Sequence, residues 1–253
     1  MSSSNLRATP MVGTNMKMRL TPSETVGYLR ELRRLTADVS GLTIFTLLPF
    51  PALPGAAITL AGSNIAWGAQ DVFPVDRGAY TGEVSAPMLA DLACRYVMAG
   101  HFERRHNRGE TNDLVANKAV AIQRSQMTPL ICIGEFTRAS IDESFEIVRQ
   151  QLDALASVDL DHSVLAYEPG WAIGAAEPAD SAWLVGMHSR IRQYLTDVST
   201  APTLIPIISG GSISVETAPG IYSLDNVDGL FVGRSALDPG AFSRLIHAIE
   251  ELR

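Results

Sequence analysis

The sequence has few cysteines and no long apolar run, and its charge balance is acidic. Two cysteines among 253 residues, Cys94 and Cys132, are too few for a disulfide framework, so we expect buried, reduced thiols in a cytoplasmic protein. No stretch approaches the roughly 18 apolar residues of a membrane helix, and the first ten residues lack the apolar core of a secretory signal. With 20 Lys+Arg against 27 Asp+Glu, the net charge of −7 argues against nucleic acid as a partner.

What the chain does contain is a regular series of short apolar runs. Apolar residues make up 46% of the sequence, enough for one large core. The runs are nearly continuous and do not alternate with polar residues, which is typical of strands buried on both faces of a parallel sheet. Amphipathic stretches at residues 23–39, 112–126 and 142–156 have the helical pattern that parallel crossovers require. The eight runs are residues 11–15, 42–48, 65–70, 96–101, 129–135, 163–169, 204–211 and 227–234.

This rhythm predicts an α/β fold, an eight-fold parallel β/α barrel (TIM barrel) that spans residues 1–253 as a single domain. No Gly/Ser-rich or charged linker interrupts the series. An open doubly wound sheet is the alternative, but it favours a Gly-rich first turn of the G-x-G-x-x-G type, and residues 12–17 contain none.

In such a barrel the chemistry lies at the carboxyl ends of the strands. Lys17, His101 and Glu168 follow strands 1, 4 and 6, and together they form an acid/base set. We expect no metal, because His101 and His106 lack the H-E-x-x-H spacing, and no cofactor. Two glycine turns, at residues 210–212 and 233–234, follow strands 7 and 8, where backbone N–H groups bind phosphate in many barrels. The sequence therefore predicts a small phosphorylated substrate.

Motifs at these positions resemble those of the triosephosphate isomerase family, in the same order and along nearly the whole chain. Asn15-Met16-Lys17 resembles the first motif, and AYEPGWAIG from Ala166 resembles the segment that carries that family's catalytic base. The remaining matches are GAYTGEVSAPML from Gly78, GHFERR from Gly100, ICIGE from Ile131, SGGSIS from Ser209 and DGLFVGRSAL from Asp228.

The resemblance implies proton transfer between adjacent carbons of a phosphorylated hydroxy-carbonyl, through an enediolate. Glu168 is the expected base, and His101 the uncharged donor that polarises the carbonyl. Lys17 would supply positive charge beside the developing oxyanion, with Asn15 as a neutral donor and Glu103 orienting Lys17.

The phosphate of the substrate has its own expected set of donors. The resemblance places the N–H groups of Gly174, Ser212, Gly233 and Arg234 around the phosphate. Each of these residues has an ordinary structural explanation as well, since glycine turns also serve as tight connections. Their positions after strands 6, 7 and 8 favour phosphate binding.

The chain departs from the family pattern near the lid, the loop that follows Glu168. Ala175, Ala176 and Glu177 stand where the family commonly has Thr-Gly-Lys. Ser209 replaces a tyrosine that latches the lid, and Phe102 replaces a serine beside the histidine.

A second departure concerns the phosphate turn itself. Arg234 replaces a glycine there, and an arginine can clamp a displaced phosphate. Changes clustered at the phosphate end, with the acid/base set retained, favour a tetrulose phosphate such as L-erythrulose 1-phosphate over the triose phosphates. The margin is small, because one carbon changes discrimination by only ~1–3 kcal/mol.

The glycolytic reaction, glyceraldehyde 3-phosphate to dihydroxyacetone phosphate, remains the alternative. A non-catalytic phosphate-binding barrel is less favoured, because it would not need all three acid/base residues. A lyase or synthase barrel is disfavoured because no lysine is placed for a Schiff base at a central strand end.

We also expect a homodimer formed through the loop at residues 71–87, from Asp71 at its start to Pro87 at its end. In that dimer Thr81 would approach Asn15 and Lys17 of the other subunit.

Overall fold

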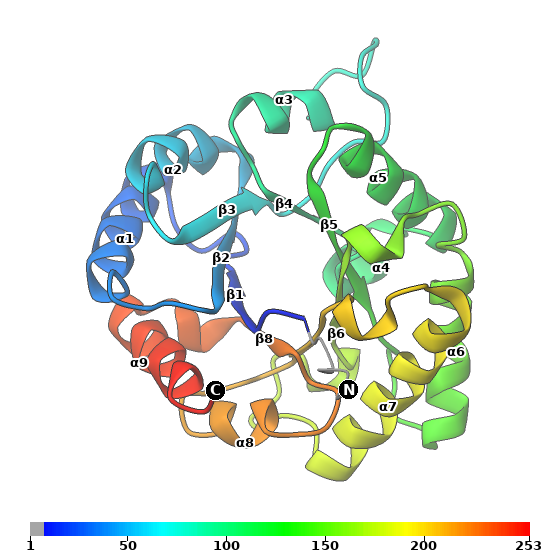
Figure 1. The fold of residues 1–253 in the computed structure, drawn as a ribbon. Helices are drawn as coiled ribbons and strands as arrows, with labels where there is room; N and C mark the ends of the chain where they lie inside the picture. The colour runs from blue at the N-terminus through cyan, green and yellow to red at the C-terminus, as the bar shows by residue number, and fades with distance from the viewer. Residues whose placement is uncertain (1–7) are drawn as a thin grey trace, which may run out of the picture.

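The computed structural model describes residues 8–253, so most of the N-terminal segment in which we predicted no secretory signal lies outside the described residues. Eight parallel strands pair in sequence order, and β8 returns to β1, which closes the barrel seen in Figure 1. The predicted fold class is confirmed. The strands are β1 (Met11–Asn15), β2 (Thr43–Leu48), β3 (Ile65–Ala69), β4 (Tyr96–Ala99), β5 (Thr128–Ile133), β6 (Val164–Tyr167), β7 (Ile207–Gly210) and β8 (Gly229–Val232).

Helices surround the strands and bury their apolar stripes against them (Figure 1). The first helix begins at a capping box between Thr21 and Glu24. It ends at Leu35, four residues before the predicted end, and the Thr36 hydroxyl donates to the Leu32 carbonyl there. The helices are α1 (Pro22–Leu35), α2 (Leu53–Leu60), α3 (Ala86–Asp91), α4 (Phe102–Arg108), α5 (Asn112–Arg124), α6 (Ile141–Asp153), α7 (Ser181–Val198), α8 (Ala218–Tyr222) and α9 (Pro239–Glu250).

Side chains fill the inside of the barrel, so it is a packed core and not a pore. Phe45, Tyr96 and Phe231 form an aromatic group there, with ring centroids 5.3 and 6.0 Å from that of Phe45. Gly13 leaves room for the Phe45 ring, because a Cβ at Gly13 would lie 2.0 Å from its Cζ atom. The strands are buried on both faces, which explains their continuous apolar runs.

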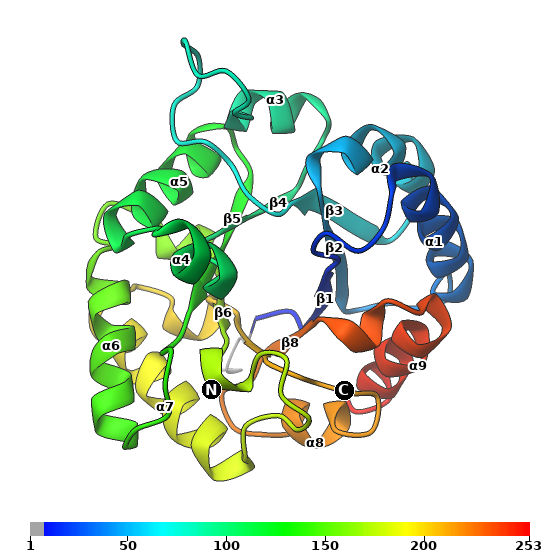
Figure 2. The same cartoon turned by 180° about the vertical axis from the view of Figure 1, so that it is seen from behind.

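The loops at the carboxyl ends of the strands carry short helices that shape a mouth. Figure 2 shows α4 and the segment after β6 over this end of the barrel. Within residues 8–253 no helix is both long enough and apolar enough to cross a membrane.

Candidate active site

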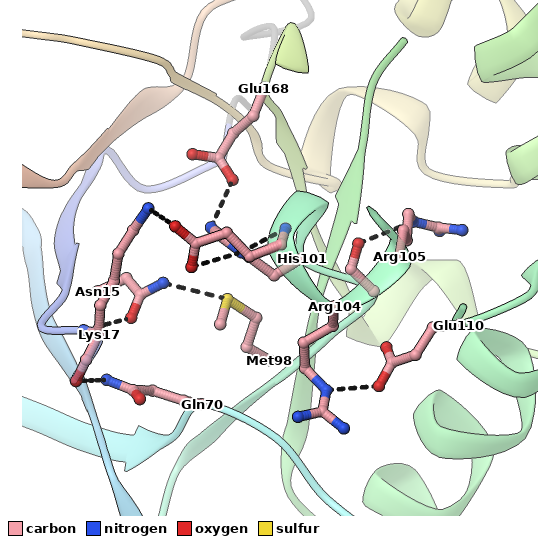
Figure 3. Close-up of polar contacts among 11 residues, drawn as sticks. Asn15, Lys17, Gln70, Met98, His101, Arg104, Arg105, Glu110 and Glu168 are labelled. Atoms are coloured by element: carbon pink, nitrogen blue, oxygen red, sulfur yellow. Dashed lines mark hydrogen bonds and ion pairs between the residues drawn. The ribbon is translucent and has the colours of Figure 1, made fainter. Parts of the chain in front are cut away.

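Four side chains from three strand ends lie together at the mouth of the barrel (Figure 3). Asn15 is the last residue of β1, and Lys17 follows two residues later. His101 follows β4 and caps α4, and Glu168 follows β6 directly. Residues on different strands, 67 to 153 positions apart in the chain, thus meet, because parallel strands end at the same side of a barrel.

Lys17 is held in place by its backbone and its side chain. Its Nζ donates to Oε1 of Glu103 at 2.6 Å, and its backbone N–H donates to Oδ1 of Asn15 at 2.9 Å. Its φ of 49° lies in the left-handed region, where a non-glycine residue is strained. Gln70 donates to the Lys17 carbonyl at 3.1 Å. The motifs predicted no role for Gln70, although a polar residue directly after β3 was a signal.

His101 is 3% exposed, and its surroundings favour the neutral ring. Burial and, to a smaller extent, the nearby Lys17 charge lower its pKa to about 4. The Nδ1 atom accepts from the backbone N–H of Glu103 at 3.2 Å. The proton of a neutral ring therefore sits on Nε2, the atom that faces Glu168.

Glu168 is 8% exposed, and burial raises the pKa of its carboxyl to about 7. The positive charge of Lys17 opposes this rise. Oε2 of Glu168 lies 3.6 Å from Nε2 of His101, and it has no hydrogen-bond partner among residues 8–253. A carboxylate that is buried and has a free oxygen can accept a proton near neutral pH.

A cavity of about 570 Å³ opens in front of these groups. Its lining also includes the four residues predicted to bind phosphate, Gly174, Ser212, Gly233 and Arg234. Two of them have left-handed backbone, with φ of 79° at Gly174 and 51° at Ser212. The side chain of Arg234 contacts the lid, because its Nη2 donates to the carbonyl of Ala175 at 3.0 Å.

The beginning of the lid is tied to a buried carboxylate, Glu135, which lies two residues after β5 and for which the motifs predicted no role. Trp171 Nε1 donates to Oε1 of Glu135 at 2.8 Å, and the Tyr167 hydroxyl donates to the same carboxylate at 3.2 Å. Burial raises the pKa of Glu135. The tryptophan two residues after Pro169 was the only sequence signal for this anchor.

Two of the unusual residues lie in apolar surroundings. The Phe102 ring fills the space beside Gly170, where a Cβ would lie 2.3 Å from it, and it stacks on His106 with centroids 5.7 Å apart. Ser209 is fully buried in β7, and its Oγ has no partner in the described part of the chain. Among residues 8–253, no three His, Cys, Asp or Glu side chains are placed to hold a metal ion.

Comparison with known proteins relates this geometry to one family. Residues 10–249 match the family model described as triosephosphate isomerase. A triosephosphate isomerase of Synechococcus sp. is 38% identical over 245 residues, 94% of this chain and 96% of the relative. That of Thermus thermophilus is 37% identical over 244 residues, 93% of this chain and 97% of the relative.

A solved structure gives the same relationship at the level of the fold. The crystal structure of triosephosphate isomerase from Bartonella henselae superposes with a TM-score of 0.84 at 27% identity. The match covers 95% of this chain and 98% of that chain. The chain therefore belongs to the triosephosphate isomerase family.

Proposed function

We propose that this isomerase moves a proton between adjacent carbons of a small sugar phosphate, with Glu168 as the base. The observation that supports it best is the pairing of a buried carboxylate, its pKa near 7, with a neutral histidine 3.6 Å away. A base with a pKa near the working pH combines a large ionised fraction with useful basicity. The reaction class is aldose–ketose isomerisation.

The proton inventory balances on the chain's own residues. Glu168 takes the proton from the carbon next to the carbonyl, while Nε2–H of His101 donates to the carbonyl oxygen. The C–H electron pair becomes the carbon–carbon double bond of an enediolate. Glu168 then returns the proton to the carbon that bore the carbonyl. The hydroxyl on the adjacent carbon gives its proton to Nε2 of His101, so its oxygen becomes the new carbonyl and the neutral histidine is restored. The ammonium of Lys17 stabilises the oxyanion, and Glu103 holds that ammonium at 2.6 Å.

The phosphate has a separate place in the same cavity. We assign it to the N–H groups of Gly174, Ser212, Gly233 and Arg234, which line the same cavity as the acid/base set. Binding energy at the phosphate then orients the reacting carbons without taking part in the chemistry. Asn15 supplies a neutral amide at the reacting end of the substrate.

For the substrate, the triose phosphates are the first candidates, since the relatives that match along the whole chain are triosephosphate isomerases. A tetrulose phosphate such as L-erythrulose 1-phosphate is the second. The small side chain of Ala176, which lines the cavity, favours it, whereas Ser209 is enclosed in β7 and leaves no room in the cavity. A clamp by Arg234 on a displaced phosphate is less favoured than the sequence predicted, because its guanidinium donates a hydrogen bond to the lid carbonyl of Ala175.

The deciding experiment measures kcat/KM of the purified protein for glyceraldehyde 3-phosphate and for L-erythrulose 1-phosphate. A value approaching the diffusional range of about 10⁸ M⁻¹s⁻¹ for the triose, with negligible tetrulose turnover, establishes the glycolytic reaction. The reverse ratio establishes the tetrulose isomerase. If neither compound turns over, the protein is a binding barrel and the proposed reaction is wrong.

The loop at residues 71–87 supports a proposal for the oligomeric state, and the two cysteines support one for the cellular compartment. The loop at residues 71–87 projects beyond α3 in Figure 1, and the rings of Phe73 and Tyr80 pack at 4.6 Å. Its base is held by ion pairs from Asp71 to Arg104 and Lys118. An ordered projection with an exposed tyrosine fits insertion into a second copy of this chain, so we propose a homodimer. Cys94 and Cys132, both buried and free, support a reducing cytoplasm.

A further inference from the structure

The lid, residues 169–178, is held to the barrel at its two ends and at its tip. Trp171 anchors the first turn through Glu135, and Asp180, just beyond the lid, caps α7 and pairs with Arg138. Among residues 8–253, the side-chain hydrogen bonds that hold the tip all go to one atom, the carbonyl oxygen of Ala175. This oxygen accepts from the Ser212 hydroxyl at 2.9 Å and from Arg234 Nη2 at 3.0 Å.

Other groups that might hold the tip do not reach it. Ser209 is enclosed in β7, and its hydroxyl has no partner within residues 8–253. Glu177 is exposed and takes part in no ion pair in the same part of the chain. The Arg234 guanidinium is therefore the one charged group among the described residues that contacts the lid tip.

We propose that the Arg234 side chain is the latch of the lid tip. This inference rests on the proposed function for the lid's purpose, which is to cover bound phosphate. Arg234 is a positioning residue: it holds the Ala175 carbonyl, and with it Gly174 and Ala176, against the cavity wall. A guanidinium suits this task, because it is planar, permanently charged and has five N–H donors. No carboxylate of residues 8–253 pairs with it, so its charge is free to favour an anion in the same cavity.

The physical advantage is pre-organisation. A tip that is already held near the phosphate end loses less conformational entropy when the substrate binds. The binding energy that would otherwise order the loop remains available for orienting the substrate. Arg234 thus affects the position of the Gly174 N–H without contacting the reacting carbons.

The test compares Arg234→Gln with a matched control, Arg19→Gln. Arg19 lines the same cavity and is exposed, but it makes no contact with the lid within the described residues. The two variants lose the same charge, and only one loses the latch. Arg234→Lys, which keeps the charge but replaces the planar guanidinium with an ammonium, serves as the conservative variant.

The first measurement is hydrogen exchange of the backbone amides of residues 173–178 in the protein without substrate. Loss of one charge-assisted hydrogen bond should speed this exchange about five- to tenfold in Arg234→Gln. Exchange in Arg19→Gln should match the parent protein, and Arg234→Lys should lie between them. Unchanged exchange in Arg234→Gln overturns the latch, whatever the turnover assays show.

The second measurement is the affinity for inorganic phosphate, followed by the fluorescence of Trp171 and the other tryptophans. We expect affinity to fall about tenfold in Arg234→Gln and about threefold or less in Arg19→Gln, where only charge is lost. An equal loss in both variants shows that Arg234 contributes only its charge, and it overturns the proposal. Neither measurement needs catalysis, so failure of the latch and failure of the proposed isomerisation are distinguishable.

Discussion

Oε2 of Glu168 lies 3.6 Å from Nε2 of His101, too far for a hydrogen bond, and both side chains are buried. Burial moves their pKa values in opposite directions, to about 7 for the acid and about 4 for the histidine. Between these values His101 is neutral, and Glu168 loses its proton as the pH rises towards 7. The pair can therefore work as a base and an uncharged donor at neutral pH.

This separation predicts the acid side of the pH profile. Below about pH 7, kcat/KM should fall about tenfold per pH unit, as Glu168 becomes protonated. Below about pH 6 the slope should steepen, because a phosphate monoester takes up its second proton there. Initial rates from pH 5 to 9 measure both slopes of the acid side, and circular dichroism checks that the protein stays folded. An acid limb that begins only below pH 5.5 would contradict the raised pKa.

Replacing the proposed base should remove catalysis while keeping the site intact. Glu168→Gln should lower kcat by about 10²–10⁴-fold or more, because an amide of the same shape cannot accept the proton. Affinity for inorganic phosphate should stay within a few-fold, since Glu168 is not among the residues proposed to bind the phosphate. A variant that keeps a tenth of the original kcat would show that the base lies elsewhere.

The same substitution should stabilise the fold at high pH. The pKa of Glu168 is raised on folding, so the folded state holds a proton that the unfolded chain has released. The free energy of unfolding therefore decreases as the pH rises from about 4.5 to about 7, and it stays lower by the full amount above that range. At about 1.4 kcal/mol per unit, Glu168→Gln should gain about 1–3 kcal/mol of unfolding free energy at pH 8 and little at pH 4. Urea titrations at the two pH values measure this, and equal differences at both would refute it.

Removing the positive charge at the reacting end should be comparably harmful. Lys17→Met should lower kcat/KM by about 10²–10⁴-fold, because the developing oxyanion loses its closest cation. Glu103→Gln is the matched control, since it removes the charged partner at 2.6 Å but leaves the ammonium in place. Glu103→Gln should lower kcat/KM by a smaller factor than Lys17→Met. Full activity in Lys17→Met would disprove the electrostatic role.

The dimer can be tested by mass in solution. Light scattering at micromolar concentration should give twice the 27.2 kDa of one chain. Tyr80→Asp, at an exposed tip residue whose ring packs on Phe73, should weaken association by placing a charge in the interface. Arg149→Ala, which removes surface ion pairs within α6 and outside the loop at residues 71–87, should leave the mass unchanged. A fully active parent protein of single-chain mass excludes the proposed interface.

The barrel and the location of the site were predictable from the linear pattern. Continuous apolar runs identify strands buried on both faces, and all eight runs contain a strand of the barrel. Parallel strands end on one side, so Lys17, His101 and Glu168 had to meet once the barrel was predicted. Periodicity and strand order are local properties of the chain, which is why they can be read without coordinates.

The protonation states of these groups and the directions of the side chains could not be predicted from the local sequence. The pKa of Glu168 depends on burial by residues from several strands, and no motif encodes the extent of that burial. Arg234 turned towards the Ala175 carbonyl, and Glu135 became the anchor of Trp171, because folding brought hydrogen-bonding atoms together across 59 and 36 positions of the chain. Hydrogen-bond geometry of this kind depends on distances of a few tenths of an ångström, which arise only when the whole barrel is packed.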